Sequence, residues 1–215
     1  MTQELASYDF GDGQGRVLAT RHPNGGGWIA LTAQVDPMST VAVDAVVYGT
    51  AVVRGAARIL DRARVGGQAV VEELATVADD AWVDGSCRIY GSAQVFGAAR
   101  CGGAAQIGGN ARVFDMAQIR GSATVTDNAW VFETAIVEGH ASIAGAARIR
   151  AEAVVRDWAK VSGAATISGT ALIGGEARVS GHAEVGGSAQ VLDQAQVIGL
   201  AVLTHEVLSG RSVRD

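Results

Sequence analysis

The sequence predicts an all-β protein built as one parallel β-helix, and three observations lead to this fold class. A six-residue pattern repeats without insertion or deletion from Gly27 to Glu206. Hydrophobic residues make up 48% of the chain and aromatic residues only 5%, so a core must be filled by small and β-branched side chains. The chain has 29 glycines and 2 prolines, which favours many tight corners over rigid loops.

Each repeat has the form Ala-x-Val/Ile-x-Gly/Asp-x, as in Ala111–Met116 and Ala177–His182. The segment from residue 27 to residue 206 contains 30 such hexads. Alanine fills the first position 27 times, and valine or isoleucine fills the third position 28 times. Glycine or aspartate fills the fifth position 23 times, so the pattern is typical of a solenoid and not a chance match.

The period of six excludes helical alternatives and predicts short strands joined by corners. Coiled coils repeat every 3.5 residues and amphipathic helices every 3.6, and neither fits a hexad. The first and third positions lie on one face of a strand, where a β-branched third residue suits a pleated surface. The fifth residue supplies the left-handed backbone that turns the chain. A strand this short must pair with the equivalent strand of the next coil.

Three hexads close into a triangular coil of 18 residues, and 30 hexads therefore make ten coils. At a strand spacing of roughly 4.8 Å, the stack is about 48 Å tall. The hexad array resembles the hexapeptide-repeat family, and its opening segment Asn24–Ile29 (Asn-Gly-Gly-Gly-Trp-Ile) is similar to the bacterial YdcK-like hexapeptide proteins. The resemblance covers roughly residues 22 to 206 and implies a single-stranded triangular prism that coils left-handedly.

The chain divides into three predicted segments. Residues 1–26 form a small N-terminal β cap, in which Tyr8–Phe10 and Arg16–Thr20 make a hairpin around the glycine-rich turn Gly11–Gly15. Residues 27–206 form the hexapeptide-repeat β-helix, and residues 207–215 form a short polar tail that caps the last coil poorly. Atypical ends are expected of a solenoid, because its terminal coils expose unpaired strand edges.

Composition and charge exclude several classes of protein. The net charge of -5 provides no basic field for nucleic acid or an anionic membrane. The first ten residues contain no secretory signal, and no apolar run approaches the roughly 18 residues of a membrane span. Cys87 and Cys101 fall at inward positions and form no disulfide framework or metal motif. We therefore expect a cytoplasmic protein that binds no metal and no cofactor.

Histidine is the first candidate for chemistry, because the family resemblance implies two kinds of histidine site. Carbonic-anhydrase-like members bind zinc through three histidines, two of them close in sequence, and this chain has no such pair. Acyltransferase-like members place one catalytic histidine near a subunit groove beside an extended loop. His140 is the one plausible counterpart, with Ser122 and Trp158 in its column, but no loop interrupts the hexads. We expect solvated corner residues at all four histidines: His22, His140, His182 and His205.

Acidic side chains recur on one corner of the predicted prism. Asp61 and Asp79 are 18 residues apart and so lie on neighbouring coils, and Asp115 and Glu133 continue the column beyond Gly97. Neighbouring carboxylates could chelate a cation such as calcium. Aspartate also tolerates left-handed backbone and is well solvated at a corner, and we favour this interpretation.

The strongest surface signal is apolar. Outward fourth positions of one face carry three phenylalanines at a spacing of 18, which are Phe96, Phe114 and Phe132. The neighbouring column of that face carries an aromatic residue between two arginines, in the order Arg112, Trp130, Arg148. Contiguous exposed apolar surface usually marks a partner, although the rings could instead form a ladder that only stabilises stacking. A second apolar column, on another face, contains Ile136, Val154 and Leu172.

These features favour a non-catalytic β-solenoid that acts as a rigid structural or protein-interaction module. We expect it to self-associate through the aromatic face, as a homo-oligomer, or to bind a protein partner, with no nucleic acid and no membrane. The alternative is a hexapeptide-family acyl- or nucleotidyl-type transferase that uses His140 at a subunit groove, since the family's enzymes act as trimers. The missing loop and the lack of a second convergent catalytic group favour the first hypothesis.

Overall fold

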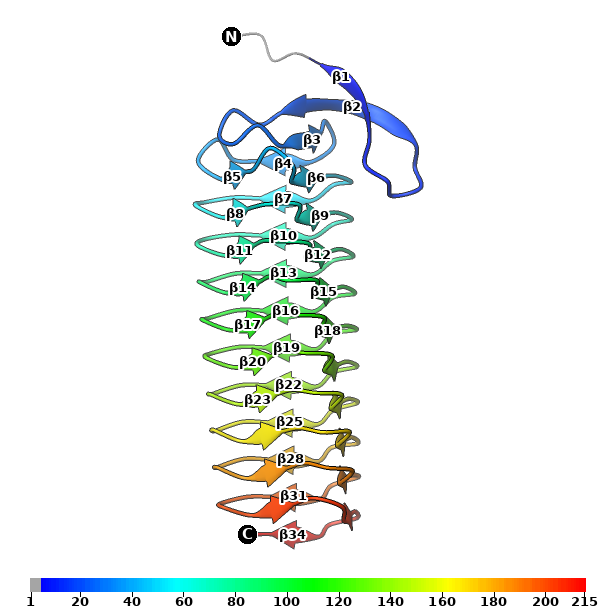
Figure 1. The fold of residues 1–215 in the computed structure, drawn as a ribbon, viewed down its shortest axis with the longest axis vertical. Coiled ribbons are helices and arrows are strands. Elements are labelled where there is room, and N and C mark those ends of the chain that lie inside the picture. The colour runs from blue at the N-terminus through cyan, green and yellow to red at the C-terminus, as the bar shows by residue number, and fades with distance from the viewer. Residues whose placement is uncertain (1–4) are drawn as a thin grey trace.

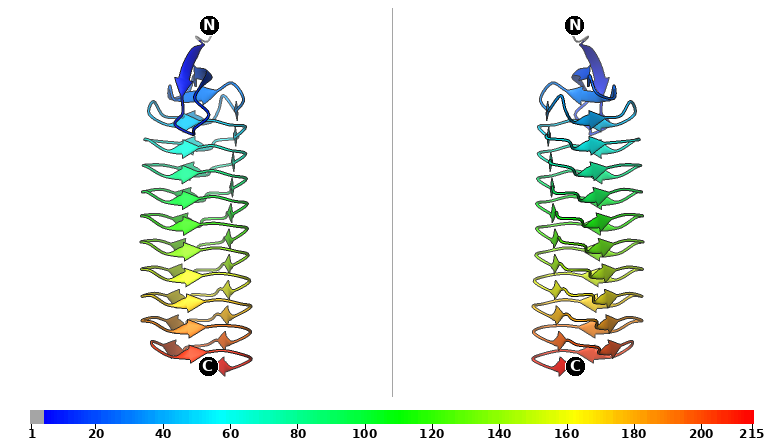
Figure 2. Two further views of the ribbon diagram at one scale, coloured as in Figure 1. Left: turned by 90° about the vertical axis from the view of Figure 1, so that its right-hand side faces the viewer. Right: turned by 90° about the vertical axis from the view of Figure 1, so that its left-hand side faces the viewer.

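A computed structural model of the protein describes residues 5–215, which form a tall stack of triangular coils below an N-terminal hairpin (Figure 1). These residues contain strands and turns only, and none of them forms a helix that could cross a membrane. The corners of successive coils stay nearly in line from one end of the stack to the other, so the sheets have little twist (Figure 2). The predicted parallel β-helix with 18 residues per coil is confirmed.

Three sheets form the faces of the prism, and each takes every third strand of the coils. Sheet 1 contains β1 (Ala6–Asp9), β2 (Arg16–Arg21), β3 (Trp28–Ala30), β6 (Val46–Val47), β9 (Arg64–Val65), β12 (Trp82–Val83), β15 (Arg100–Cys101), β18 (Gln118–Ile119), β21 (Ile136–Val137), β24 (Val154–Val155), β27 (Leu172–Ile173), β30 (Gln190–Val191) and β33 (Val207–Leu208). Sheet 2 contains β4 (Gln34–Val35), β7 (Val52–Val53), β10 (Val70–Val71), β13 (Arg88–Ile89), β16 (Gln106–Ile107), β19 (Thr124–Val125), β22 (Ser142–Ile143), β25 (Lys160–Val161), β28 (Arg178–Val179), β31 (Gln196–Val197) and β34 (Val213–Arg214). Sheet 3 contains β5 (Thr40–Val41), β8 (Arg58–Ile59), β11 (Thr76–Val77), β14 (Gln94–Val95), β17 (Arg112–Val113), β20 (Trp130–Val131), β23 (Arg148–Ile149), β26 (Thr166–Ile167), β29 (Glu184–Val185) and β32 (Val202–Leu203).

The interior is a column of methyl groups, as the hexads predict. First- and third-position side chains such as Ala111 and Val113 are 0% exposed, and so are nearly all of their equivalents along the stack. Cys87 and Cys101 are free and fully within this core. A hydrogen bond between the two thiols, together with burial, raises the pKa of Cys101, so Cys101 stays a neutral packing residue.

The N-terminal hairpin packs on the outer face of sheet 1. β1 and β2 are antiparallel, and β2 continues the sheet by pairing antiparallel with β3. The rings of Tyr8 and Trp28 stack with centroids 4.8 Å apart, and those of Phe10 and Tyr48 with centroids 5.6 Å apart. Arg64 also donates a hydrogen bond to the carbonyl of Phe10. The hairpin therefore covers the upper end of sheet 1.

The C-terminal end differs from the expected tail. Strand pairs are 18 residues apart as far as Glu184 and Val202, but Gln190 pairs with Val207 and Gln196 with Val213, a spacing of 17. One residue is therefore missing at the corner between β32 and β33, and residues 207–215 continue the stack with β33 and β34. Hexad counting cannot place this deletion, because no residue beyond Leu203 keeps the Ala-x-Val pattern.

The corners explain why the fifth position alternates between glycine and acidic residues. Nine non-glycine residues have φ between 53° and 63°, and Ala151 is the one of them without a carboxylate. Each of the others accepts a hydrogen bond from the corner N–H of the following coil, as Asp127 Oδ2 does from the N–H of Gly145 at 2.8 Å. Asp61 and Asp79 belong to this set, with Oδ2 to N distances of 3.2 and 2.9 Å. These eight carboxylates thus link adjacent coils.

We predict that Ala151→Asp stabilises the protein. Ala151 has φ of 58°, a conformation costly for alanine, and its coil has no acidic link to the corner N–H of Gly169. The new carboxylate should accept that hydrogen bond and raise the free energy of unfolding by about 1 kcal/mol, measured by chemical denaturation. Ala151→Gly is the control, because it relieves the backbone cost without adding the link. An aspartate variant no more stable than the glycine variant would contradict the proposed role of the corner carboxylates.

Candidate functional site

The outer face of sheet 3 carries two parallel columns of side chains, one from second positions and one from fourth positions. We number the coils 1 to 10 by the strands of this 10-stranded sheet, from β5 to β32. The second-position column reads Thr40, Arg58, Thr76, Gln94, Arg112, Trp130, Arg148, Thr166, Glu184, Val202. The fourth-position column reads Ala42, Leu60, Ala78, Phe96, Phe114, Phe132, Arg150, Ser168, Gly186, Thr204.

The three phenylalanines of sheet 3 form a regular ladder in coils 4 to 6. The ring centroids of Phe96 and Phe114 are 5.0 Å apart with an interplanar angle of 3°, and those of Phe114 and Phe132 are 5.0 Å apart at 4°. All three side chains are half-buried, since each ring covers one face of the next. The three rings therefore stack as a ladder, which was one of the two alternatives for this column. The outer edges of the rings remain open to a partner.

Trp130 extends the aromatic surface into the neighbouring column. Its ring meets Phe114 edge-on, with centroids 6.1 Å apart and an interplanar angle of 77°. The guanidinium carbons of Arg112 and Arg148 lie 5.3 and 5.2 Å from the Trp130 ring centroid, on the coils before and after it. These cation–π contacts hold the arginines against the sheet.

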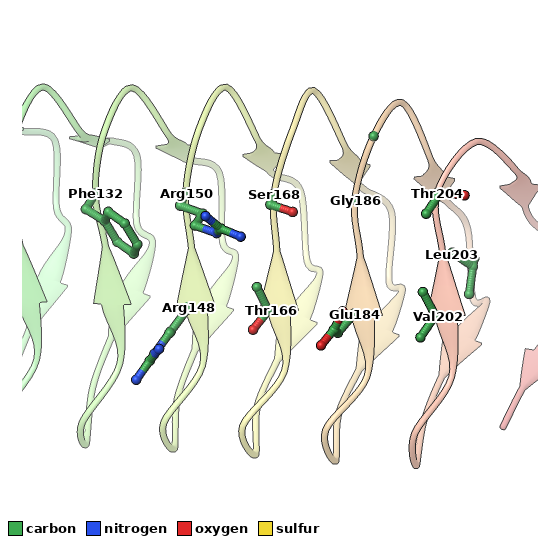
Figure 3. A pocket seen from close by; sticks show the side chains of 11 residues that line it. Phe132, Arg148, Arg150, Thr166, Ser168, Glu184, Gly186, Val202, Leu203 and Thr204 are labelled. Atoms are coloured by element: carbon green, nitrogen blue, oxygen red, sulfur yellow. The ribbon is translucent and has the colours of Figure 1, made fainter.

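Below the ladder the face of sheet 3 is hollowed into a groove of about 530 Å³ (Figure 3). The fourth-position column changes from the large Phe132 and Arg150 to the small Ser168 and Gly186, which leaves space above the sheet. Arg148, Thr166, Glu184 and Val202 line the groove from the other column. The sequence analysis missed this groove, although the fall in side-chain size at spacing 18 could have indicated it.

The charges of sheet 3 are unpaired. Among the described residues, none of its five charged side chains forms an ion pair: Arg58, Arg112, Arg148, Arg150 and Glu184. All five are exposed.

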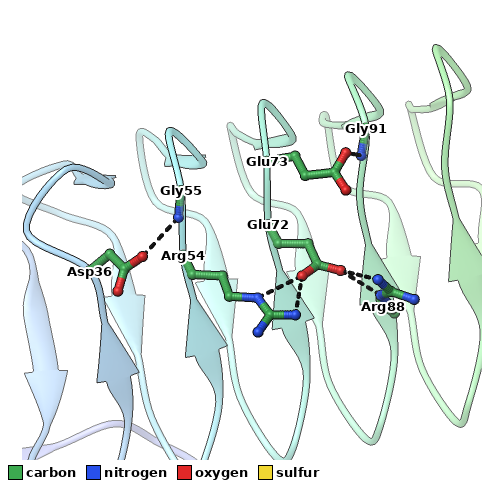
Figure 4. Close-up of polar contacts among 7 residues, drawn as sticks. All are labelled: Asp36, Arg54, Gly55, Glu72, Glu73, Arg88 and Gly91. Carbon is green, nitrogen blue, oxygen red and sulfur yellow. Dashed lines mark hydrogen bonds and ion pairs between the residues drawn. The ribbon is translucent and has the colours of Figure 1, made fainter.

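Sheet 2 contains an ion-paired triad. Glu72 is 4% exposed and lies between Arg54 and Arg88, whose Nε atoms donate to its two carboxylate oxygens at 2.6 and 2.5 Å (Figure 4). Burial raises the pKa of Glu72, but the hydrogen bonds and charges of the two arginines lower it by more. The pKa of Glu72 is therefore below its ordinary value. This triad is complete within one chain.

The histidines do not assemble a reactive site. His140, His182 and His205 are exposed at corners, as expected, and the ring of His140 stacks on Trp158 with centroids 4.0 Å apart. His140 lies at the corner between sheets 1 and 2, away from the groove of sheet 3. The expectation for His22 was wrong: it is 3% exposed, and its ring nitrogens lie 3.0 and 3.1 Å from the carbonyl oxygens of Asn24 and Asp36.

The other predicted features lie elsewhere. Ile136, Val154 and Leu172 follow one another on sheet 1, where all three are half-buried. Within residues 5–215, no group of three or more His, Cys, Asp or Glu side chains is arranged to hold a metal ion.

Comparison with known proteins finds similar solved structures at low sequence identity. No family model matches the chain, and no curated protein matches it. The structure of LpxA from Acinetobacter baumannii is similar with a TM-score of 0.41 and 16% identity, over 83% of this chain and 67% of that one. The UDP-N-acetylglucosamine acyltransferase from Campylobacter jejuni is similar with a TM-score of 0.37 and 14% identity, over 81% of this chain and 69% of that one.

We predict that Glu72 makes the stability of the protein pH-dependent. Because its pKa is lowered in the folded state, Glu72 contributes stability above its unfolded pKa of about 4.3, and this contribution disappears as the pH falls through the folded value. Glu72→Gln should therefore lower the free energy of unfolding by about 1–2 kcal/mol at pH 7 and by little at pH 3. Denaturation at both pH values measures this. Glu152→Gln, at an exposed acid without an ion pair, should show no such difference. An equal loss at both pH values would mean that the triad does not stabilise through charge.

Proposed function

We propose that the protein is a non-catalytic β-solenoid that acts as a rigid structural and interaction module and self-associates through sheet 3. The observation that carries the proposal is the outer face of that sheet. It combines the ladder of Phe96, Phe114 and Phe132 with Trp130 on one flat surface, in a chain with only 4 phenylalanines and 4 tryptophans. Apolar patches of this kind, bordered by polar residues, are typical of protein interfaces.

The stacked coils supply the rigidity that such a module needs. The core is continuous from Val41 to Leu203, and hydrogen bonds join each coil to the next along this length. We also propose that the chain is related to the bacterial YdcK-like hexapeptide proteins, because its opening segment Asn24–Ile29 and the hexads that follow resemble theirs.

Phe114→Ser, at the centre of the ladder, tests the proposal. The substitution should shift the assembly to monomers, because it removes the middle ring of the proposed interface. It should also lower the stability of the chain by about 1–3 kcal/mol, since two ring stacks at roughly 0.5–1.5 kcal/mol each are lost. Light scattering and a melting curve on the same sample separate the two effects.

Val154→Ser is the matched control, because Val154 is the half-buried centre of the apolar column on sheet 1. It should leave the mass unchanged. A Phe114→Ser protein of unchanged mass with a large loss of melting temperature would mean that the ladder is purely structural, and the interface proposal would be wrong.

A hexapeptide-type transferase is the second candidate. The two similar structures are an LpxA and a UDP-N-acetylglucosamine acyltransferase, and acyl transfer is the reaction to test for this candidate. The one residue that we would assign to this chemistry is His140, which is exposed and held by Trp158. No hydrogen bond within the described chain orients its imidazole, and the groove of sheet 3 lies on the opposite side of the prism.

Incubation with acyl-CoA and nucleotide-sugar donors distinguishes the two candidates. We expect no release of CoA or nucleotide from the wild-type protein. We also expect His140→Ala to keep the melting temperature and the mass of the wild type, because only one exposed ring stack is lost. If the wild-type protein turned over one of these donors and His140→Ala did not, the structural role would be wrong and the protein would be a transferase.

A further inference from the structure

Sheet 3 is complementary to itself when two copies pack face to face in opposite directions. We infer that the protein forms an antiparallel two-fold dimer through sheet 3, in which coil n of one copy faces coil 11 − n of the other. This inference rests on the proposed self-association and adds its geometry. A two-fold axis parallel to the strands brings each column of side chains onto the same column of the second copy. The order of residues along each column therefore determines which residues meet.

The charges match in this register. Arg58 in coil 2 faces Glu184 in coil 9 of the second copy, and the two-fold axis produces this pair twice. Glu184 is the one acidic residue in the two columns, and neither it nor Arg58 has an ion-pair partner within the described chain. Pairing across the interface would satisfy both side chains.

The remaining arginines of the face also meet suitable groups. Arg112 faces Trp130 of the second copy, and Arg150 faces Phe96 of the second copy, so neither guanidinium group lies opposite another cation. Arg148 faces the amide of Gln94. No arginine lies opposite another arginine in this arrangement.

The shapes match as well. Leu60 in coil 2 lies opposite Gly186 in coil 9 of the second copy, where the missing side chain forms the deepest part of the fourth-position column (Figure 3). Leu60 is half-buried in the single chain and would enter the groove of the other. At the centre, Phe114 and Phe132 of one copy meet Phe132 and Phe114 of the other. Leu60 thus faces a position without a side chain, and rings face rings in the middle.

Other arrangements of the same face are unfavourable. If the two β-helices packed in the same direction, Arg148 of each copy would lie against Arg150 of the other. The interface would then hold four arginines in one layer. If the antiparallel copies were shifted by one coil, Arg112 would lie opposite Arg148 of the second copy for one direction of the shift. For the other direction it would lie opposite Arg112 of the second copy. Each alternative also separates Arg58 from Glu184, so like charges meet while the acid remains unpaired. The preferred register is the one in which all ten coils overlap.

The area of the face is sufficient for a stable dimer. Ten strands at about 4.8 Å and four residues at about 3.3 Å give a face of about 600 Å² on each subunit. Both subunits together would bury about 1,200 Å², the lower end of the range for specific interfaces. The little-twisted sheets allow contact along the whole length of the stack (Figure 2).

A charge exchange tests the register. Arg58→Glu and Glu184→Arg should each weaken dimerisation at least tenfold, measured by light scattering and sedimentation over a range of concentrations. The double variant should return to within about threefold of the wild type, because it restores two opposite-charge pairs in reversed order. Arg178→Glu, an exposed second-position arginine of sheet 2, is the control and should dimerise normally. A double variant as weak as the single ones would overturn the register.

A spin label at Val202→Cys tests the direction of packing. Cys87 and Cys101 are buried, so the exposed position 202 alone should react. In the antiparallel dimer the two labels lie nine coils apart, about 43 Å, whereas parallel packing would bring them within roughly 15 Å. A short distance, or a mass above that of a dimer, would overturn this inference and leave self-association standing. A monomeric wild-type protein would overturn both.

Discussion

The backbone hydrogen bonds between successive coils hold every other feature of the molecule in place. Arg112 N–H donates to the carbonyl of Ala129 at 2.9 Å, and Phe114 N–H donates to the carbonyl of Val131 at 3.0 Å, and the same pattern recurs along the stack. Because these bonds join residues almost one full coil apart, each side chain lies directly beside its counterpart 18 positions on. An interaction that suits one pair of coils can therefore be repeated as a column.

The columns show which residue types can follow one another at a strand spacing of about 4.8 Å. Phenylalanines stack on phenylalanines, since parallel rings at that spacing attract one another. Glu72 lies between the guanidinium groups of Arg54 and Arg88, and Trp130 lies between Arg112 and Arg148 in one column. At the corners, a carboxylate on left-handed backbone accepts the next corner N–H.

The three faces of the prism differ in how far their interactions are completed within one chain. The N-terminal hairpin covers the upper end of sheet 1, where Tyr8 and Phe10 pack on Trp28 and Tyr48. Sheet 2 has the Glu72 triad, with its charges paired. Sheet 3 keeps open ring edges, a groove and charges without partners, so its interactions are the ones that a second copy would complete.

The sequence by itself determined the period, the inward and outward positions and the membership of each column, because strand alternation and an 18-residue repeat are local rules. It therefore placed Phe96, Phe114 and Phe132 in one line. Only the tertiary structure decided that the rings stack, that His22 is buried, and that Ser168 and Gly186 open a groove. These properties depend on how side chains from different coils fill the space between them, and no repeat along the chain encodes those distances.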